Sequence, residues 1–152
     1  MEKLEIIENN LNVDDFINLR KTGPFIEYEK EDVEIALKNN LYSVSVYKDN
    51  QVIGIVRIVG DGRICFFIKD LVVHPDYKGK KIGALLMKYI FKYIEENACY
   101  NAYIGLMATV NTEGFYEKFG FIRRPNENHG AGMIMYYKGV NNKWRKLLYS
   151  VV

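Results

Sequence analysis

The chain has few of the residues that hold small proteins together through disulfides or metal ions. Its 152 residues include only two cysteines, two histidines and three prolines. Cys65 and Cys99 lack C-x-x-C spacing and lie among apolar neighbours. This argues against a disulfide scaffold, a redox pair and a thiolate metal site. We therefore expect no metal, and we expect both cysteines to be buried as small apolar residues.

An excess of charge of one sign and a long hydrophobic run are also missing. The 21 basic and 19 acidic residues are scattered along the chain and leave a net charge of +2, which gives little support to a nucleic-acid surface. Residues 1–5 alternate charged and apolar side chains, unlike a signal peptide, and Lys88 and Lys92 interrupt the longest apolar stretch. These features predict a cytoplasmic protein that binds neither nucleic acid nor membrane.

Apolar residues make up 49% of the chain, enough for one domain with a substantial core. Strand patterns cover residues 4–7, 41–47, 52–59, 64–73, 102–108, 121–124 and 133–138. Helical patterns cover residues 14–21, 30–39, 82–96 and 112–118. Turn residues at 49–50 and 60–62 predict an antiparallel meander. The fold class is therefore α+β, with a mixed central sheet of about six to seven strands and about four helices.

The C-terminal tail, residues 140–152, contains the only tryptophan of the chain. Trp144 is followed by Leu147, Leu148 and Tyr149, an apolar group. We expect this tail to pack either on the domain formed by residues 1–139 or on a partner subunit. The second alternative corresponds to a homodimer.

The most informative segment runs from Val72 to Met87, from an apolar strand through a basic glycine-containing turn into a helix. The first turn of a helix has unpaired N–H groups and a partial positive charge, and glycine lets an anion approach closely. Lys78, Lys80 and Lys81 add long-range attraction. The segment predicts a site that holds the phosphates of a nucleotide.

Two motifs in this chain resemble those of the GNAT superfamily of acetyl-CoA-dependent N-acetyltransferases. The family's signature Gln/Arg-x-x-Gly-x-Gly/Ala falls on Lys78-Gly79-Lys80-Lys81-Ile82-Gly83, with lysine at the first position and Lys81 in place of the first signature glycine. The family's Asn-x-x-Ala-x-x-Tyr-x-x-x-Gly-Phe segment falls on residues 111–121, with Gly114 at the alanine position. The resemblance covers nearly the whole chain and implies a single-domain acyl-CoA N-acyltransferase fold.

The resemblance also implies acetyl-CoA as co-substrate and assigns the residues that hold it. Pantetheine is expected along the main chain of Leu71, Val72 and Val73, where an amide of Leu71 or Val72 stabilises the oxyanion. The pyrophosphate is expected at Lys78, Gly79, Lys80, Lys81, Gly83 and Ala84. Asn111 is expected to cap the following helix, to bond the cofactor, or both. The same residues 70–73 fit an ordinary buried strand equally well.

Direct transfer requires a base for the amine and an acid for the departing thiolate. The resemblance places the Tyr116 hydroxyl beside the CoA sulfur, and a phenol with a pKa near ~10 is protonated at neutral pH; otherwise Tyr116 is a core aromatic. Some family members have a glutamate base on the fourth strand, but Phe67 stands there. Asp70 and water on main-chain carbonyls are the candidate bases. Asp70 also fits an exposed strand residue or a partner of the neighbours of Lys69.

The family builds much of its acceptor site from the first two helices and their connection, residues 22–29 of this chain. Phe25 and Tyr28 are the candidate substrate-binding residues, and Glu27 and Glu29 could attract a cationic amine or simply be solvated. We expect a transferase that acetylates a primary amine of a small molecule. A peptide or protein amine, and a non-catalytic CoA-binding module, are the alternatives. The sequence does not encode which amine or which acyl chain is used.

Overall fold

The computed structural model describes residues 3–150 of the chain. It divides into two compact units, the first ending at Leu106 and the second beginning at Met107. The first unit contains the sheet, and each unit is considered below by itself.

The sheet of the first unit has five strands in the order β1-β2-β3-β4-β5. They are β1 (Glu5–Glu8), β2 (Tyr42–Lys48), β3 (Gln51–Gly60), β4 (Cys65–Val73) and β5 (Tyr103–Gly105). All neighbours are antiparallel except β4 and β5, which are parallel. Asp49 and Asn50 join β2 to β3 with φ of 49° and 63°, as a two-residue hairpin turn of twisted strands requires. The mixed sheet and its central meander are confirmed.

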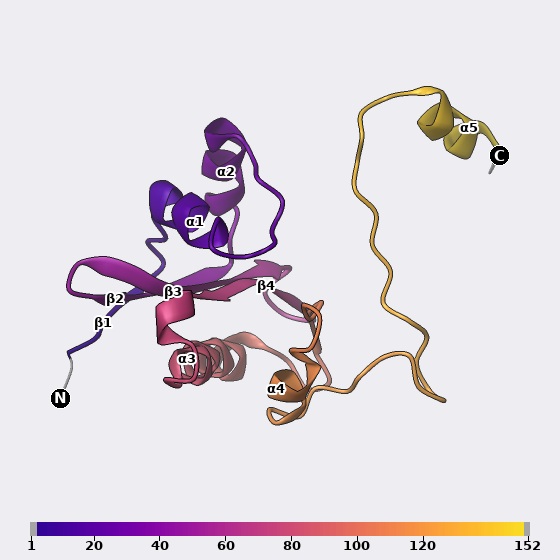
Figure 1. The fold of residues 1–152 in the computed structure, drawn as a ribbon. Helices are drawn as coiled ribbons and strands as arrows, with labels where there is room; N and C mark the ends of the chain where they lie inside the picture. Colours follow the sequence, from indigo (N-terminus) through magenta and orange to yellow (C-terminus); the bar gives the residue numbers. More distant parts are fainter. Residues whose placement is uncertain (1–2, 151–152) are drawn as a thin grey trace. The chain divides into compact units, whose positions relative to one another are not determined.

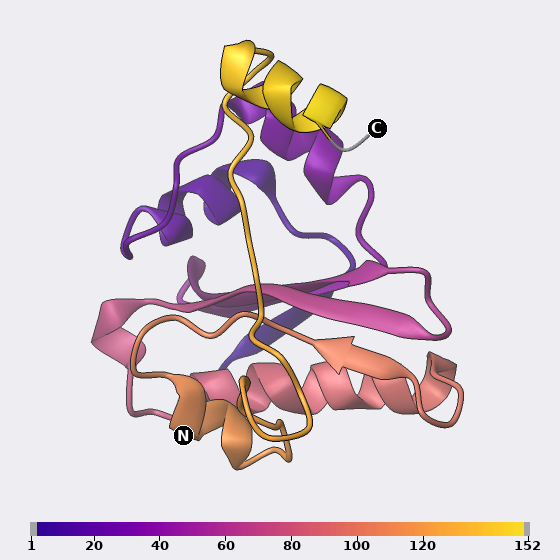
Figure 2. The same ribbon diagram turned by 90° about the vertical axis from the view of Figure 1, so that its right-hand side faces the viewer.

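Helices cover both faces of this sheet (Figures 1 and 2). One face carries α1 (Val13–Arg20) and α2 (Lys30–Leu37), and the other carries α3 (Ile82–Asn97). On the first face, Phe16, Leu19 and Val33 are buried against strand residues such as Ile55 and Val72. On the second face α3 buries Ile82, Leu86, Met87 and Ile90. The central strand β3 is therefore apolar on both sides.

Gly54 on β3 lets α3 approach the sheet closely. A Cβ at this position would lie 2.8 Å from Cγ2 of Ile82 and 3.2 Å from Cδ1 of Leu86. We expect Gly54→Ala to lower the free energy of unfolding by about 1–3 kcal/mol, because an overpacked core must shift. Urea denaturation measures this change. Gly114→Ala is the control, since nothing lies within 4 Å of a Cβ there; equal losses in both variants would contradict the packing argument.

The second unit contains α4 (Glu113–Glu117) and α5 (Asn142–Ser150). The strands predicted at residues 121–124 and 133–138 are wrong: within residues 3–150 these segments form no strand. Within the described residues the sheet therefore has five strands rather than about six to seven, and there are five α-helices rather than about four. Met133, Ile134 and Met135 are exposed. Their strand-like pattern expresses a propensity that is realised only beside a pairing strand.

One smaller expectation also changes. Cys65 is exposed and Cys99 is half-buried, so the expected burial is wrong for Cys65. The tail contains the helix α5, whose Leu147, Leu148 and Tyr149 are exposed. No helix among the described residues is both long enough and apolar enough to cross a bilayer.

Candidate functional site

Strand β4 contains a bulge at the position where pantetheine is predicted. Val72 pairs with Ile55 and Lys69 pairs with Arg57, so Asp70 and Leu71 together oppose the single residue Val56. Asp70 adopts φ of 57°. A bulge disrupts the hydrogen-bond ladder locally and re-aims the backbone. It thus alters the main chain at the residues predicted to contact the thioester.

One edge of β4 is paired with β5 along only part of its length. The pairing joins Cys65, Phe66 and Phe67 to Tyr103, Ile104 and Gly105. Among the strands of the described residues, the remainder of β4, residues 68–73, pairs only with β3. An extended amide-containing ligand could add to such an edge. Leu71, Val72 and Val73 are all in this part of the strand.

The same strand leads directly into the predicted phosphate cradle. After β4 come a short 3-10 turn, η1 (Pro75–Tyr77), and then Gly79 with φ of 76°. The Nδ1 atom of His74 accepts from the Asp76 amide at 3.1 Å, so His74 helps to form this turn. The first hydrogen bond into α3 joins the Leu85 amide to the Lys81 carbonyl. Helix geometry therefore leaves the N–H groups of Ile82, Gly83 and Ala84 without an intrahelical acceptor.

Lysines surround the beginning of α3. Lys78, Lys80 and Lys81 are exposed. The ammonium of Lys80 lies 5.2 Å from the centre of the Tyr77 ring, and that of Lys48 lies 5.4 Å from it. Positive side chains and free N–H groups together suit an anionic ligand.

Lys81 is the N-cap residue of α3 and adopts a left-handed conformation, with φ of 66°. Lys81 stands at the position of the first glycine in the signature Gln/Arg-x-x-Gly-x-Gly/Ala. A non-glycine residue in this conformation costs about 1–2 kcal/mol. The chain therefore keeps the backbone geometry that glycine permits, even though the residue is lysine.

Tyr116 and Asn111 belong to the second unit. Tyr116 lies on α4 and is half-buried between Phe115 and Phe121, with ring centres 5.0 and 6.1 Å away. Burial raises the pKa of Tyr116 above its ordinary value of 10.0, so the hydroxyl keeps its proton at neutral pH. Thr112, not Asn111, is the N-cap of α4. The capping role of Asn111 is therefore wrong, and cofactor binding stays a prediction.

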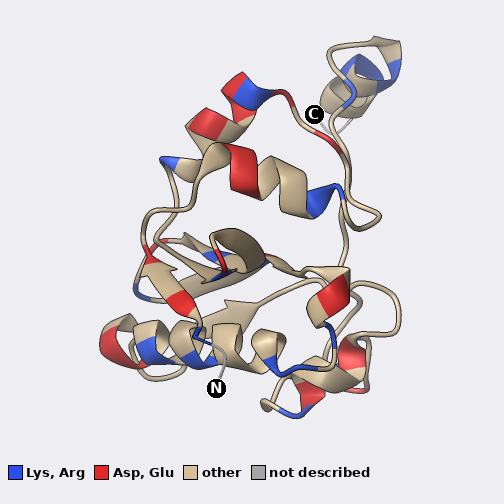
Figure 3. Ribbon diagram, turned by 60° about the vertical axis from the view of Figure 1, so that its left-hand side comes forward, with Lys and Arg blue, Asp and Glu red and all other residues tan. Residues whose placement is uncertain are grey.

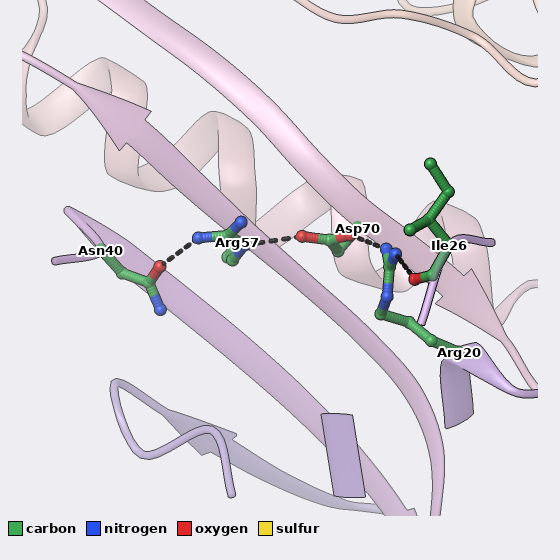
Figure 4. A network of polar contacts seen from close by, with 5 residues as sticks. All are labelled: Arg20, Ile26, Asn40, Arg57 and Asp70. Atoms are coloured by element: carbon green, nitrogen blue, oxygen red, sulfur yellow. Dashed lines mark hydrogen bonds and ion pairs between the residues drawn. The ribbon is translucent and has the colours of Figure 1, made fainter. Parts of the chain in front are cut away.

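Asp70 lies between two arginines (Figure 4). Its carboxylate accepts from Nη1 of Arg20 and, at 2.6 Å, from Nε of Arg57. The Asp70 side chain is only 4% exposed. The alternative prediction, that Asp70 is an exposed strand residue, is therefore wrong. Sequence reasoning missed Arg20 and Arg57 as partners, because they are 50 and 13 residues away in the chain and no local pattern links them.

Phe25 and Tyr28 both contact Arg20, the arginine that binds Asp70. The guanidinium of Arg20 lies 5.0 Å from the centre of the Phe25 ring and 5.6 Å from that of Tyr28. Both rings line a cavity of about 270 Å³ that also includes Arg20, Glu27 and Glu29. Within the described part of the chain, no group of three or more His, Cys, Asp or Glu residues could hold a metal ion.

Comparisons with known proteins agree with this geometry. The model of the acetyltransferase (GNAT) family matches residues 9–121. An uncharacterized N-acetyltransferase, ycf52, of Porphyra purpurea is 27% identical over 121 residues, which are 77% of this chain and 68% of that protein.

Two solved structures have the same fold at higher or similar identity. A probable acetyltransferase of unknown function from methicillin-resistant Staphylococcus aureus superimposes with a TM-score of 0.81 and 31% identity, over 89% of this chain and 100% of the other. A GNAT family acetyltransferase from Streptococcus pneumoniae gives a TM-score of 0.74 and 26% identity, over 90% and 100% of the two chains. Since the family model covers most of the chain and both motifs, the protein belongs to the GNAT family of N-acetyltransferases.

Proposed function

We propose that this N-acetyltransferase moves the acetyl group of acetyl-CoA to a primary amine of a small molecule. One observation carries the proposal: the part of β4 without a β5 partner leads, through the left-handed residues Gly79 and Lys81, into the free N–H groups of α3. A ligand with an amide-containing arm and a diphosphate matches this sequence of features.

The reaction is a direct displacement at the thioester carbonyl. The amine nitrogen forms a C–N bond, the carbonyl oxygen becomes an oxyanion, and the C–S bond then breaks. Preorganised main-chain donors stabilise such an oxyanion, and the Leu71 and Val72 amides beside the bulge are our candidates. The thiolate takes the proton of the Tyr116 hydroxyl, and the new amide nitrogen loses its extra proton to a base. The Tyr116 phenolate then regains a proton from solvent, which has received the proton of the amine.

Water is the more suitable base in this account. Both carboxylate oxygens of Asp70 accept hydrogen bonds from arginine, and its side chain is only 4% exposed. As a base Asp70 would have to take the amine proton in competition with two ion pairs. Phe67 carries no base. Water held by main-chain carbonyls can deliver the proton to solvent, and this role needs no further side chain.

The acceptor is proposed to enter beside α1 and α2. Phe25 and Tyr28 provide apolar walls, and a cavity of about 270 Å³ suits a small molecule. Acidic residues lie along both helices, including Asp14 and Asp15 on α1 and Glu31 and Asp32 on α2 (Figure 3). The cavity itself is lined by Arg20, Lys21 and Lys30 as well as by Glu27 and Glu29. Within its lining, Glu27 and Glu29 are therefore the groups that could attract a cationic amine.

Assays of acetyl transfer to a panel of amines test this function. We expect release of free CoA thiol with at least one small primary amine, and no release when the amine is omitted. Lysine-containing peptides form the second arm, because a peptide amine is the other acceptor class. Binding of CoA without turnover on either arm would contradict the proposed reaction.

A further inference from the structure

We propose that Arg20 is a positioning residue that links the acceptor loop, residues 21–29, to the bulge of β4. This link fixes the position of the acceptor relative to the thioester. The proposal rests on the proposed function. Arg20 lines the proposed acceptor cavity, but it touches neither the predicted CoA segment nor the predicted reacting atoms. Its positioning role is exerted through Asp70 and the loop.

The first contact of Arg20 is with the bulge. Asp70 has a left-handed backbone, φ of 57°, in the middle of a strand, a conformation that persists only when its surroundings hold it. Arg20 from α1 and Arg57 from β3 hold its carboxylate from two sides. Nη1 of Arg57 also donates to Oδ1 of Asn40 at 3.0 Å. The carboxylate is thus anchored to two separate elements.

The second contact of Arg20 is with the loop. Its Nη2 donates to the Ile26 carbonyl at 2.8 Å (Figure 4). Its guanidinium also lies against the rings of Phe25, Tyr28 and, at 5.3 Å, Phe16. The two nitrogens of one planar group therefore bind the bulge and the loop at the same time. Lysine has no such fork.

Burial makes this link strong. The side chains of Arg20 and Arg57 are 12% and 14% exposed, so water screens the ion pairs less than it would at the surface. Two guanidinium groups share one carboxylate, which leaves a net positive charge in the cluster. Loss of Asp70 would leave both cations without their counter-charge. For that reason the test changes Arg20 and leaves Asp70 in place.

Steady-state kinetics of Arg20→Lys and Arg20→Met test the positioning role. Arg20→Lys keeps a cation for Asp70 but loses the forked contact with the Ile26 carbonyl. We expect the acceptor KM to rise about 10-fold in Arg20→Lys. In Arg20→Met we expect the same rise in KM together with a fall in kcat, because misplaced reactants react more slowly. The Kd of CoA is expected to change much less than the acceptor KM, because the turn and helix start proposed to hold the pyrophosphate, residues 78–84, make no contact with Arg20. Arg63→Lys and Arg63→Met are matched controls, since Arg63 also donates to a main-chain carbonyl, that of Asn97.

Amide hydrogen exchange provides a readout that does not depend on acetyl transfer. We expect Arg20→Met to speed exchange in residues 21–29 and in residues 69–72 together, whereas the Arg63 variants change neither segment. Faster exchange in the loop alone would overturn the coupling, and unchanged acceptor KM with faster exchange in both segments would overturn the positioning role. If the wild-type protein transfers no acetyl group, the proposed function fails, while the exchange data still decide whether Arg20 couples the two segments. If Arg20→Met does not fold, the acceptor KM and the exchange pattern of Arg20→Lys decide the question.

Discussion

Replacing Tyr116 by phenylalanine is expected to lower kcat by about 100-fold or more, because a positioned general acid contributes about 10²–10⁴-fold. The substitution removes only the hydroxyl and keeps the ring that packs on Phe115 and Phe121. The Kd of CoA should therefore stay within about twofold, since the phenol is not proposed to hold the cofactor. Initial rates at saturating acetyl-CoA and amine, together with calorimetric titration of CoA, measure both quantities.

Tyr100→Phe is the control for this experiment, because Tyr100 is 93% exposed and belongs to the first unit. The pH dependence gives a second check. Burial raises the pKa of Tyr116 above that of an ordinary phenol, so the wild-type hydroxyl keeps its proton throughout the neutral range. Activity that depends on this acid is thus present at neutral pH and is lost only as the pH rises through the raised pKa of Tyr116. An equal kcat in Tyr116→Phe and wild type would remove Tyr116 from the mechanism.

Replacing Gly79 by valine is expected to weaken CoA binding about 5- to 30-fold. Gly79 has φ of 76° in the turn before α3, and nothing lies within 4 Å of a Cβ there. The cost of a valine here therefore comes from backbone conformation and not from a steric clash. A left-handed residue other than glycine costs about 1–2 kcal/mol. A change of about 1.4 kcal/mol corresponds to a tenfold change in affinity. Calorimetric titration with CoA measures the change in Kd.

Gly79→Asn is the matched control, because asparagine tolerates the left-handed region better than other residues. Its Kd for CoA should lie between those of wild type and Gly79→Val. If Gly79→Val binds CoA as tightly as wild type does, the left-handed turn is not part of the cofactor site. If both variants lose binding equally, side-chain bulk and not backbone conformation determines the affinity.

Much of the first unit could be predicted from the sequence, because its elements are specified locally. The turn at Asp49 and Asn50 and the apolar face of α3 are short-range signals, and both appear in the structure. The prediction of residues 133–138 as a strand failed because a strand pattern gives no information about whether a partner strand is present.

The features of the site that were missed depend on long-range contacts or on backbone conformation. Arg20, Arg57 and Asp70 come from three elements, and only the folded sheet brings their charges together. The left-handed conformation of Lys81 is also hidden in the sequence, since lysine rarely adopts it. The motif residues 78–84 lie on a turn and at the start of a helix, as predicted, but the bulge at Asp70 was not predicted.

The central claim is that main-chain groups along β4 and at the start of α3 bind coenzyme A. The most direct test is a titration of the ¹⁵N-labelled protein with CoA, followed through the amide signals in two-dimensional NMR spectra. We predict that the largest shifts map to residues 71–73 and 79–84. Saturable shifts confined to other residues, or no shifts at millimolar CoA, would contradict the account.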